Sequence, residues 1–336
     1  MSMSYLTLTF CRGRKFHWKI FAFSLLTALV ASGSALAQAQ DFPTRPIRFV
    51  VAYPPGGSVD YVARLLAHTI APQLGQPIVV ENRAGASGIV GTQAMAAAAG
   101  DGHSFLVAAT AVMAIVPHLR KVPFVPQRDF IPVARLADTV SLFAANKHIQ
   151  ANNFDELITQ AKQENRELRF GYVGVGTITH LMGEIIRNET GVKLLSVPYK
   201  GNTDNVNAAL SGEIDFIIDP TAISHVKSGA LKALAVNAPQ RVASLPEVPT
   251  IREGQVRITA APSWISLFAP KATPPSTVER MSALMAAALA DPEVQQKLLM
   301  GGVSAHYQAP AEFAQQIQKD SLFYAELIRK YEVLAD

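Results

Sequence analysis

The stretch that decides the fold runs from residue 48 to residue 60 and reads Arg48-Phe49-Val50-Val51-Ala52-Tyr53-Pro54-Pro55-Gly56-Gly57-Ser58-Val59-Asp60. Its first residues form an apolar run typical of a buried strand, and from Tyr61 onward apolar residues recur at helical spacing. The glycines between them let backbone N–H groups approach a ligand, and a helix N-terminus adds unpaired donors. The stretch therefore predicts a strand, a binding turn and a helix, with Ser58 as N-cap and Asp60 as a structural acid in the first turn.

Strand and helix patterns alternate beyond this stretch. Apolar strands are predicted at 77–80 and 104–108, with an alanine-rich helix at 91–99 between them. The same pattern returns in a second set of strands, predicted at 169–173, 195–198 and 216–218. Alternation of this kind is typical of βαβ units and of a mostly parallel sheet. Its repetition predicts two α/β domains of like topology.

The chain is predicted to cross between these domains twice. Strand patterns occur at 140–143 and 264–268, and three helices are predicted after them, starting at Pro275, Pro292 and Pro310. If these last helices return to the first domain, the two crossings form a hinge beside a cleft that closes on a ligand. The predicted boundaries are 40–142 and 263–336 for the first lobe and 143–262 for the second.

The composition is that of a globular protein. Hydrophobic residues make up 49% and charged residues 17% of 336, which excludes a disordered chain, a coiled coil and a collagen-like repeat. The net charge is +4, but four of the 30 Lys and Arg residues lie in the first 37 positions, which contain no acid. The remaining 26 basic residues balance 26 Asp and Glu. No nucleic-acid partner is therefore predicted.

The first 39 residues are predicted to be a cleaved export signal. A basic stretch ending at Lys19 precedes an apolar run at 20–30, and an Ala-x-Ala pattern follows at 35–37. The apolar run is too short to span a bilayer core of roughly 30 Å. Cleavage would remove Cys11, the only cysteine, which excludes disulfides and thiol catalysis in the mature chain. We expect a periplasmic protein.

Two further glycine turns precede predicted helices, at 85–88 and 174–177. Helix N-termini at three such turns can converge on a cleft and hold a carboxylate without an arginine. The sequence has no complete dinucleotide fingerprint, no Gly-Lys-Ser/Thr, no Gly-x-Ser-x-Gly and no His-x₃-His pair. No cofactor, no metal and no enzymatic activity are therefore predicted, although a Ser/His/Asp triad assembled in space stays open.

Six blocks occur in a characteristic order along the mature chain, namely 43–48, 55–60, 80–88, 174–177, Val197-Pro198-Tyr199-Lys200-Gly201 and 245–250. Together they resemble the Bug-type solute-binding proteins, the extracytoplasmic receptors of tripartite tricarboxylate transporters. The resemblance implies a two-lobe type II periplasmic binding protein fold with two hinge strands. It also implies a small carboxylate ligand (an organic acid, a dicarboxylate or an acidic amino acid), membrane permease subunits as partners, and a monomer.

The resemblance also implies a set of ligand-binding residues, at which main-chain amides and bridging water hold the ligand. They are Tyr53, Pro55, Gly56, Gly57, Ser87, Gly88, Thr110, Gly174, Gly176, Thr177, His180 and Asp219. Arg83 and Lys200 are expected to build turns instead, because exposed charges are usually solvated. Tyr172-Val173 and Asp204-Asn205 depart from the family pattern, and the first departure affects pocket size. A sensor that presents its closed form to a membrane kinase is the alternative function.

Overall fold

The computed structural model describes residues 42–334, apart from 140, 239, 243 and 256–262. The chain divides into two units, Met1–Phe42 and Pro43–Asp336, and every element described below belongs to the second. The predicted export signal at 1–39 lies outside the described residues.

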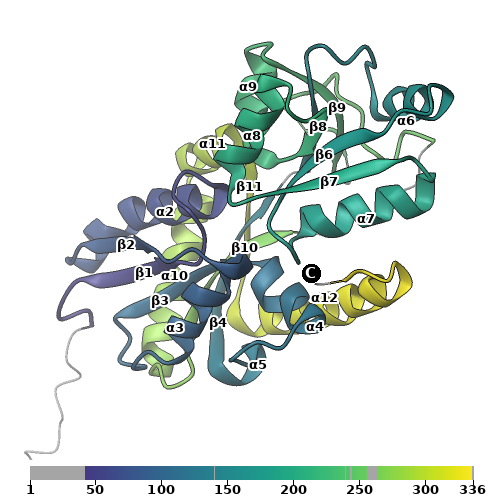
Figure 1. The fold of residues 1–336 in the computed structure, drawn as a ribbon. Helices are drawn as coiled ribbons and strands as arrows, with labels where there is room; N and C mark the ends of the chain where they lie inside the picture. Colours follow the sequence, from purple (N-terminus) through teal and green to yellow (C-terminus); the bar gives the residue numbers. More distant parts are fainter. Residues whose placement is uncertain (1–41, 140, 239, 243, 256–262, 335–336) are drawn as a thin grey trace, which may run out of the picture. The chain divides into compact units, whose positions relative to one another are not determined.

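Two mixed sheets define two lobes (Figure 1). The first sheet has the strand order β11 (Val303–Gln308), β4 (Phe130–Thr139), β10 (Trp264–Pro270), β3 (Ser104–Ala109), β1 (Ile47–Val51) and β2 (Ile78–Asn82). The second has the order β7 (Leu194–Tyr199), β6 (Leu168–Val173), β8 (Phe216–Ile218), β5 (Ser141–Asn146) and β9 (Leu231–Asn237). In Figure 1 the second sheet and its helices are teal and green.

Both sheets contain the same parallel core, which confirms the predicted internal repetition. Strand β1 lies between β3 and β2 and runs parallel to both. Strand β6 lies between β8 and β7 in the same way. The strand orders are therefore β3-β1-β2 in the first lobe and β8-β6-β7 in the second. The turns that follow these parallel strands meet at one edge of each sheet.

The sheets are less parallel than the sequence predicts. Strand β10 runs antiparallel to both β3 and β4, and β5 runs antiparallel to both β8 and β9. These are the strands next to the crossings between the lobes. A strand that enters from the other lobe starts at the opposite end of the sheet. It is therefore antiparallel to the strands of the local βαβ units.

The two crossings lie side by side. The chain leaves the first sheet at Thr139 and enters the second at Ser141, and it is back in the first sheet at Trp264. The Thr139 N–H donates to the Ser263 carbonyl at 2.9 Å, which joins the outgoing and returning segments. The predicted boundaries at 142/143 and 262/263 stay a prediction, and β5 joins the second sheet two residues before the first of them.

Helices cover both lobes. Those of the first lobe are α2 (Ser58–Leu74), η2 (Ala86–Gly88), α3 (Ile89–Ala96), η3 (Ala111–Ile115), α4 (Val116–Leu119), α5 (Pro126–Asp129), α10 (Pro275–Ala290), α11 (Pro292–Met300) and α12 (Pro310–Lys330). Those of the second are α6 (Phe154–Gln163), α7 (Ile178–Thr190), α8 (Asn202–Ser211), η4 (Pro220–Ala222) and α9 (Ile223–Lys227).

The last helices pack on the first lobe, as the sequence predicts. Helix α10 packs on β4 and α2, and α12 packs on β4, η3 and α4. Trp264 of β10 is fully buried, and its ring centroid lies 5.0 Å from that of Phe313 on α12. The C-terminal part of α12 also packs on the second lobe, because Tyr324 and Leu327 belong to the apolar cluster built mainly by that lobe. Helix α12 therefore contributes to both cores.

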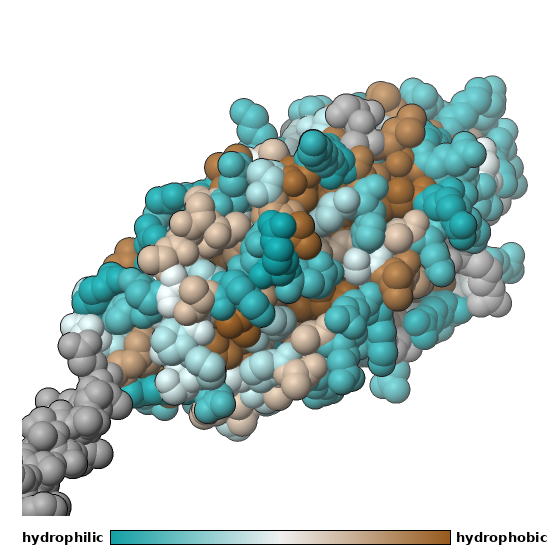
Figure 2. Space-filling model, turned by 90° about the horizontal axis from the view of Figure 1, so that it is seen from below, coloured by the Kyte–Doolittle hydropathy of each residue, from teal (hydrophilic) through white to brown (hydrophobic). Residues whose placement is uncertain are grey.

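The surface offers no large apolar area on the face shown in Figure 2, where hydrophobic residues lie in separate groups among hydrophilic ones. In the described part of the chain, no helix combines the length and the apolar character needed to cross a membrane.

Candidate functional site

The turn between β1 and α2 is held by hydrogen bonds, and α2 begins without a side-chain cap. Gly57, not Ser58 as predicted, is the N-cap of α2, because its backbone is extended (φ −82°, ψ 170°) and the helix begins at Ser58. The Asp60 carboxylate accepts a hydrogen bond from the Gly56 N–H at 3.0 Å and others from Arg64 at 3.0 Å. No side chain caps the first turn of α2. Its first N–H groups can therefore serve a ligand.

The acid in this turn is structural. Burial raises the pKa of Asp60, but hydrogen bonds from Arg64, the Gly56 N–H and Asn82 outweigh burial and bring the pKa below its ordinary value of 3.8. Asp60 is therefore ionised at neutral pH, and its charge faces the helix N-terminus that it stabilises. Asn82 also donates to the Tyr53 carbonyl at 3.1 Å, which ties β2 to the turn.

The turn between β6 and α7 is the counterpart in the second lobe. Gly174 and Gly176 have positive φ angles, +75° and +79°. Thr177 is the N-cap of α7, and its Oγ1 donates to the Gly174 carbonyl at 2.9 Å. His180 accepts a hydrogen bond from the Gly176 N–H at 3.3 Å, and its ring stacks on Tyr172 at 4.9 Å. His180 is buried, and its hydrogen bond with the Gly176 N–H supports the turn.

The turns of the two lobes touch each other. The Ser87 hydroxyl of the first lobe donates to the Val175 carbonyl of the second at 2.5 Å. A Cβ at position 57 would lie 2.8 Å from the Asn202 side-chain oxygen. Because Ser87 and Val175 belong to different lobes, as do Gly57 and Asn202, the cleft is closed at these points.

The turns of the two lobes line a cavity of about 310 Å³, called here the cleft cavity. It opens at the N-termini of α2, α7 and α8, where Ser58, Thr179 and Asn202 line it. Thr139 and Ser141 of the crossing segment line it as well. Among the described residues that line it, one carries a charge, Asp204 in the first turn of α8. The site therefore presents three helix N-termini, one acid and, among the described lining residues, no cation.

A second cavity of about 600 Å³ adjoins the first, with Tyr53, Pro54, Val173 and Thr177 lining both. It will be called the second cavity. It is lined by the turn at 85–88, by the 174–175 turn, and by two cations, Arg120 and Lys200.

The structure distributes the predicted site residues over these two cavities. Tyr53, Pro55, Gly57 and Thr177 line the cleft cavity, and Tyr53, Ser87, Gly88, Gly174 and Thr177 line the second cavity. Neither cavity is lined by Gly56, Gly176, Thr110, His180 or Asp219; Gly56 is exposed and the other four are buried. Contact of any of these residues with a ligand stays a prediction.

Two of these buried residues, Thr110 and Asp219, are held by hydrogen bonds within the protein. The Thr110 hydroxyl oxygen accepts a hydrogen bond from the Trp264 N–H at 2.8 Å, which joins the end of β3 to β10. Asp219 is fully buried and accepts hydrogen bonds from the Asn202 side chain at 3.0 and 2.9 Å. Burial raises the pKa of Asp219, against the effect of these hydrogen bonds. Asp219 therefore positions Asn202 at the cleft cavity.

Sequence reasoning missed Asn202 and Arg120. Asn202 follows the strand-to-helix turn at 199–201, which is the same kind of turn as those at 56–57 and 174–177, so a signal for it existed. Arg120 ends the short helix α4 and belongs to none of the six blocks. Its place beside the second-lobe turns depends on how the lobes meet.

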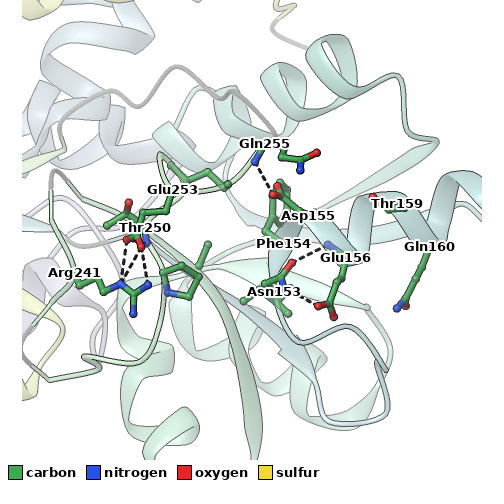
Figure 3. A pocket seen from close by; sticks show the side chains of 15 residues that line it. Asn153, Phe154, Asp155, Glu156, Thr159, Gln160, Arg241, Thr250, Glu253 and Gln255 are labelled. Atoms are coloured by element: carbon green, nitrogen blue, oxygen red, sulfur yellow. Dashed lines mark hydrogen bonds and ion pairs between the residues drawn. The ribbon is translucent and has the colours of Figure 1, made fainter.

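A third pocket, of about 620 Å³, lies on the second lobe away from the turns and is shown in Figure 3. Its polar groups bind one another: Arg241 pairs with Glu253 at 2.6 Å, and the Asp155 carboxylate accepts the Gln255 N–H at 2.5 Å. A ligand would have to break these contacts, so the pocket is a weaker candidate than the cleft. Among the described residues, no group of three or more His, Cys, Asp or Glu could hold a metal ion.

Two α/β lobes, joined by two crossing segments and closed over a cavity at helix N-termini, define a two-lobe solute-binding protein. Residues 62–333 match the model of the tripartite tricarboxylate transporter family receptors, and the chain belongs to that family. The predicted resemblance to Bug-type receptors is thereby confirmed.

Relatives and solved structures agree with this assignment. A protein encoded in the tcbD–tcbE intergenic region of Pseudomonas sp. is 33% identical over 92% of this chain and 93% of its own. BugT of Bordetella pertussis is 36% identical over 73% of this chain and 76% of its own. The periplasmic binding protein BugD superimposes with a TM-score of 0.82 at 32% identity, covering 88% of this chain and 100% of BugD.

Two of the similar structures contain a ligand. An R. palustris protein solved with adipate has a TM-score of 0.83 at 28% identity, covering 87% of this chain and 99% of that one. MatC from Rhodopseudomonas palustris, solved with bound malate, has a TM-score of 0.79 at 29% identity, covering 85% of this chain and 100% of MatC.

Proposed function

We propose that this protein is a periplasmic receptor that binds a small carboxylate in the cleft cavity. It delivers the acid to the permease subunits of a tripartite transporter. The receptor acts as a monomer, exported by cleavage of the signal at 1–39, and the acid leaves it chemically unchanged. The first lobe comprises 40–142 and 263–336, and the second comprises 143–262.

The uncapped N-terminus of α2 carries this proposal. Helix α2 has 17 residues, begins at Ser58 and receives no side-chain cap. Ser58 and Val59 of its first turn line the cleft cavity. An uncapped helix N-terminus combines unpaired N–H donors with a partial positive charge, and both favour a carboxylate. Thr179 and Asn202 line the cavity from the second lobe, at the N-terminal ends of α7 and α8.

The contacts between the lobes supply the second requirement of a receptor, a closed form that differs from the open one. The Ser87–Val175 hydrogen bond exists when the lobes are together, and a side chain at position 57 would then meet Asn202. A ligand that bridges the lobes stabilises this form by its differential affinity for it. A permease can then distinguish the loaded receptor from the empty one. The adipate and malate complexes of the similar proteins support a carboxylate as the ligand.

A thermal-shift screen of mono-, di- and tricarboxylates on the protein purified from periplasm tests the proposal. A ligand at 100 times its Kd stabilises the folded state by about 2.7 kcal/mol. We expect at least one acid to raise the melting temperature and to be recovered intact. N-terminal sequencing of the same sample should begin between residues 37 and 40.

Three results would contradict the proposal. One is a panel in which no acid stabilises the protein, and another is turnover of the acid that binds. The third concerns the partner: crosslinking of the loaded receptor in membranes should capture permease subunits, and capture of a sensor kinase would favour the alternative.

A further inference from the structure

The cleft cavity contains a negative charge that the protein leaves without a cationic partner. Asp204 lies in the first turn of α8, lines the cavity and is exposed. Within the part of the chain that the structure describes, Asp204 forms no salt bridge and no side-chain hydrogen bond. The described residues that line the cavity also include no Lys, Arg or His. A cationic group of a ligand would therefore meet an acid that is free to bind it.

Asp60 occupies the equivalent position of α2 and shows how an acid with a structural role is held. Each acid is the third residue of its helix, since α2 begins at Ser58 and α8 at Asn202. Asp60 is buried and accepts hydrogen bonds from the Gly56 N–H and from Arg64, both at 3.0 Å. The partial positive charge of a helix N-terminus favours both acids. Only the protein contacts of Asp60 go beyond this effect of helix position.

The first turn of α8 faces the turn that precedes α2 when the lobes are together. A Cβ at position 56 would lie 3.4 Å from the Thr203 Oγ1, and one at position 57 would lie 2.8 Å from the Asn202 side-chain oxygen. Asp204 is the next residue of α8. The cavity of about 310 Å³ is at the small end of the range for ligand pockets. A carboxylate held at the N-terminus of α2 therefore shares a small cavity with this acid.

The charge and the remaining lining restrict the kind of ligand. Asp204 repels a second carboxylate on the ligand and attracts an ammonium group, and both effects grow as the cavity loses water. Apolar side chains of both lobes line the same cavity, among them Val59, Ile178 and Ile265. An apolar group of the ligand gains free energy by leaving water for these walls. The lining thus suits a molecule with one carboxylate, one ammonium group and an apolar part.

We infer that this receptor binds an α-amino acid with an apolar side chain. The carboxylate lies at the N-terminus of α2, the ammonium group faces Asp204, and the side chain packs on Val59, Ile178 and Ile265. Asp204 is then a specificity-determining residue, which favours a zwitterion over a diacid and over a simple monoacid. This inference rests on the proposed function and narrows it from small carboxylates to amino acids of this kind.

The test compares three ligands with one carbon skeleton by isothermal titration calorimetry. Leucine, 4-methylpentanoate and 2-isobutylmalonate carry an ammonium group, a hydrogen and a second carboxylate at the same carbon. Valine and phenylalanine give two further sets, with a smaller and a larger side chain. In the best set, the wild type should bind the amino acid about 10-fold more tightly than the monoacid, as expected for a hydrogen bond between charged groups. The diacid should bind most weakly.

Substitutions of Asp204 should change two affinities in opposite directions. Asp204→Asn should weaken binding of the amino acid to the level of the monoacid and strengthen binding of the diacid, without weakening the monoacid. A folding defect would weaken all three ligands together. Asp204→Glu keeps the charge and should keep the preference for the amino acid. Glu167→Gln is the matched control, because it removes an exposed acid of the second lobe that lines neither cavity.

The outcomes separate the inference from the proposed function. Wild-type protein that binds the monoacid or the diacid as tightly as the amino acid in every set overturns the inference. A preference for the amino acid that persists in Asp204→Asn also overturns it, as does an equal loss in Glu167→Gln. The same holds if other acids bind and no amino acid does. In these cases the proposed function stands, whereas failure of every acid and amino acid to bind would refute the proposed function itself.

Discussion

The substitution Gly57→Val should separate ligand binding from folding. Gly57 has φ −82° and ψ 170°, an extended conformation that any residue adopts, so valine introduces no backbone strain. A Cβ at this position would nevertheless lie 2.8 Å from the Asn202 side-chain oxygen, across the boundary between the lobes. The clash exists in the closed form alone. We expect the free energy of unfolding of the empty protein to change by less than about 0.5 kcal/mol.

The magnitude of the binding loss follows from how Asn202 is held. Its Nδ2 donates to both oxygens of the buried Asp219, at 3.0 and 2.9 Å, so the amide cannot retreat without breaking charge-assisted hydrogen bonds. Such bonds contribute about 1.5–3 kcal/mol, which corresponds to roughly 10- to 100-fold in affinity. We expect that loss for Gly57→Ala and at least about 100-fold for Gly57→Val, whose two methyl groups add bulk beside Asn202.

The assay is calorimetric titration with the tightest acid from the thermal-shift screen, paired with thermal unfolding of the empty protein by circular dichroism. A double-mutant cycle supplies the control. In an Asn202→Ala background the amide is gone, so the effect of Gly57→Ala should fall below about threefold. Binding by Gly57→Val within about threefold of wild type would refute the reasoning. An effect of Gly57→Ala that persists at full size beside Asn202→Ala would show that the closure argument is wrong.

Three further changes test other parts of the structure. Ser87→Ala removes the hydrogen bond to Val175 between the lobes, so calorimetry should show about 2- to 10-fold weaker binding with unchanged unfolding; unchanged affinity would contradict a role in closure. Trp264→Phe leaves the buried Asp320 carboxylate without its 2.7 Å donor, and urea denaturation should show a loss of about 2–3 kcal/mol, with under 1 kcal/mol as the contrary result. Asp60→Asn should lower the free energy of unfolding at pH 7 by about 1–3 kcal/mol. Because the pKa of Asp60 is lowered in the folded state, its contribution to stability is present above pH 3.8 and disappears as pH falls through the folded pKa. Urea curves of the variant and the wild type should therefore converge near the folded pKa. A difference in stability that persists at lower pH would contradict the assigned role of the ionised carboxylate.

The internal repetition of the fold could be read from local patterns. Apolar runs and glycine turns at 48–60 and 169–177 predict the backbone conformation of their own residues. Such short-range patterns do not depend on distant parts of the chain. The third-first-second order of parallel strands in both sheets agrees with that reading. The antiparallel strands β5 and β10 were not foreseen, because their direction depends on the lobe from which the chain arrives.

The sequence by itself determined the family, the two-fold repetition and the turns that line the cavities between the lobes, because each depends on residues close together along the chain. Tertiary structure alone decided which of those turns touch. It placed Ser87 against Val175, anchored Asn202 on Asp219, and brought Arg120 and Lys200 to one cavity. These pairs join distant parts of the chain across a hinge, and their geometry depends on how the lobes pack. No local pattern carries that information.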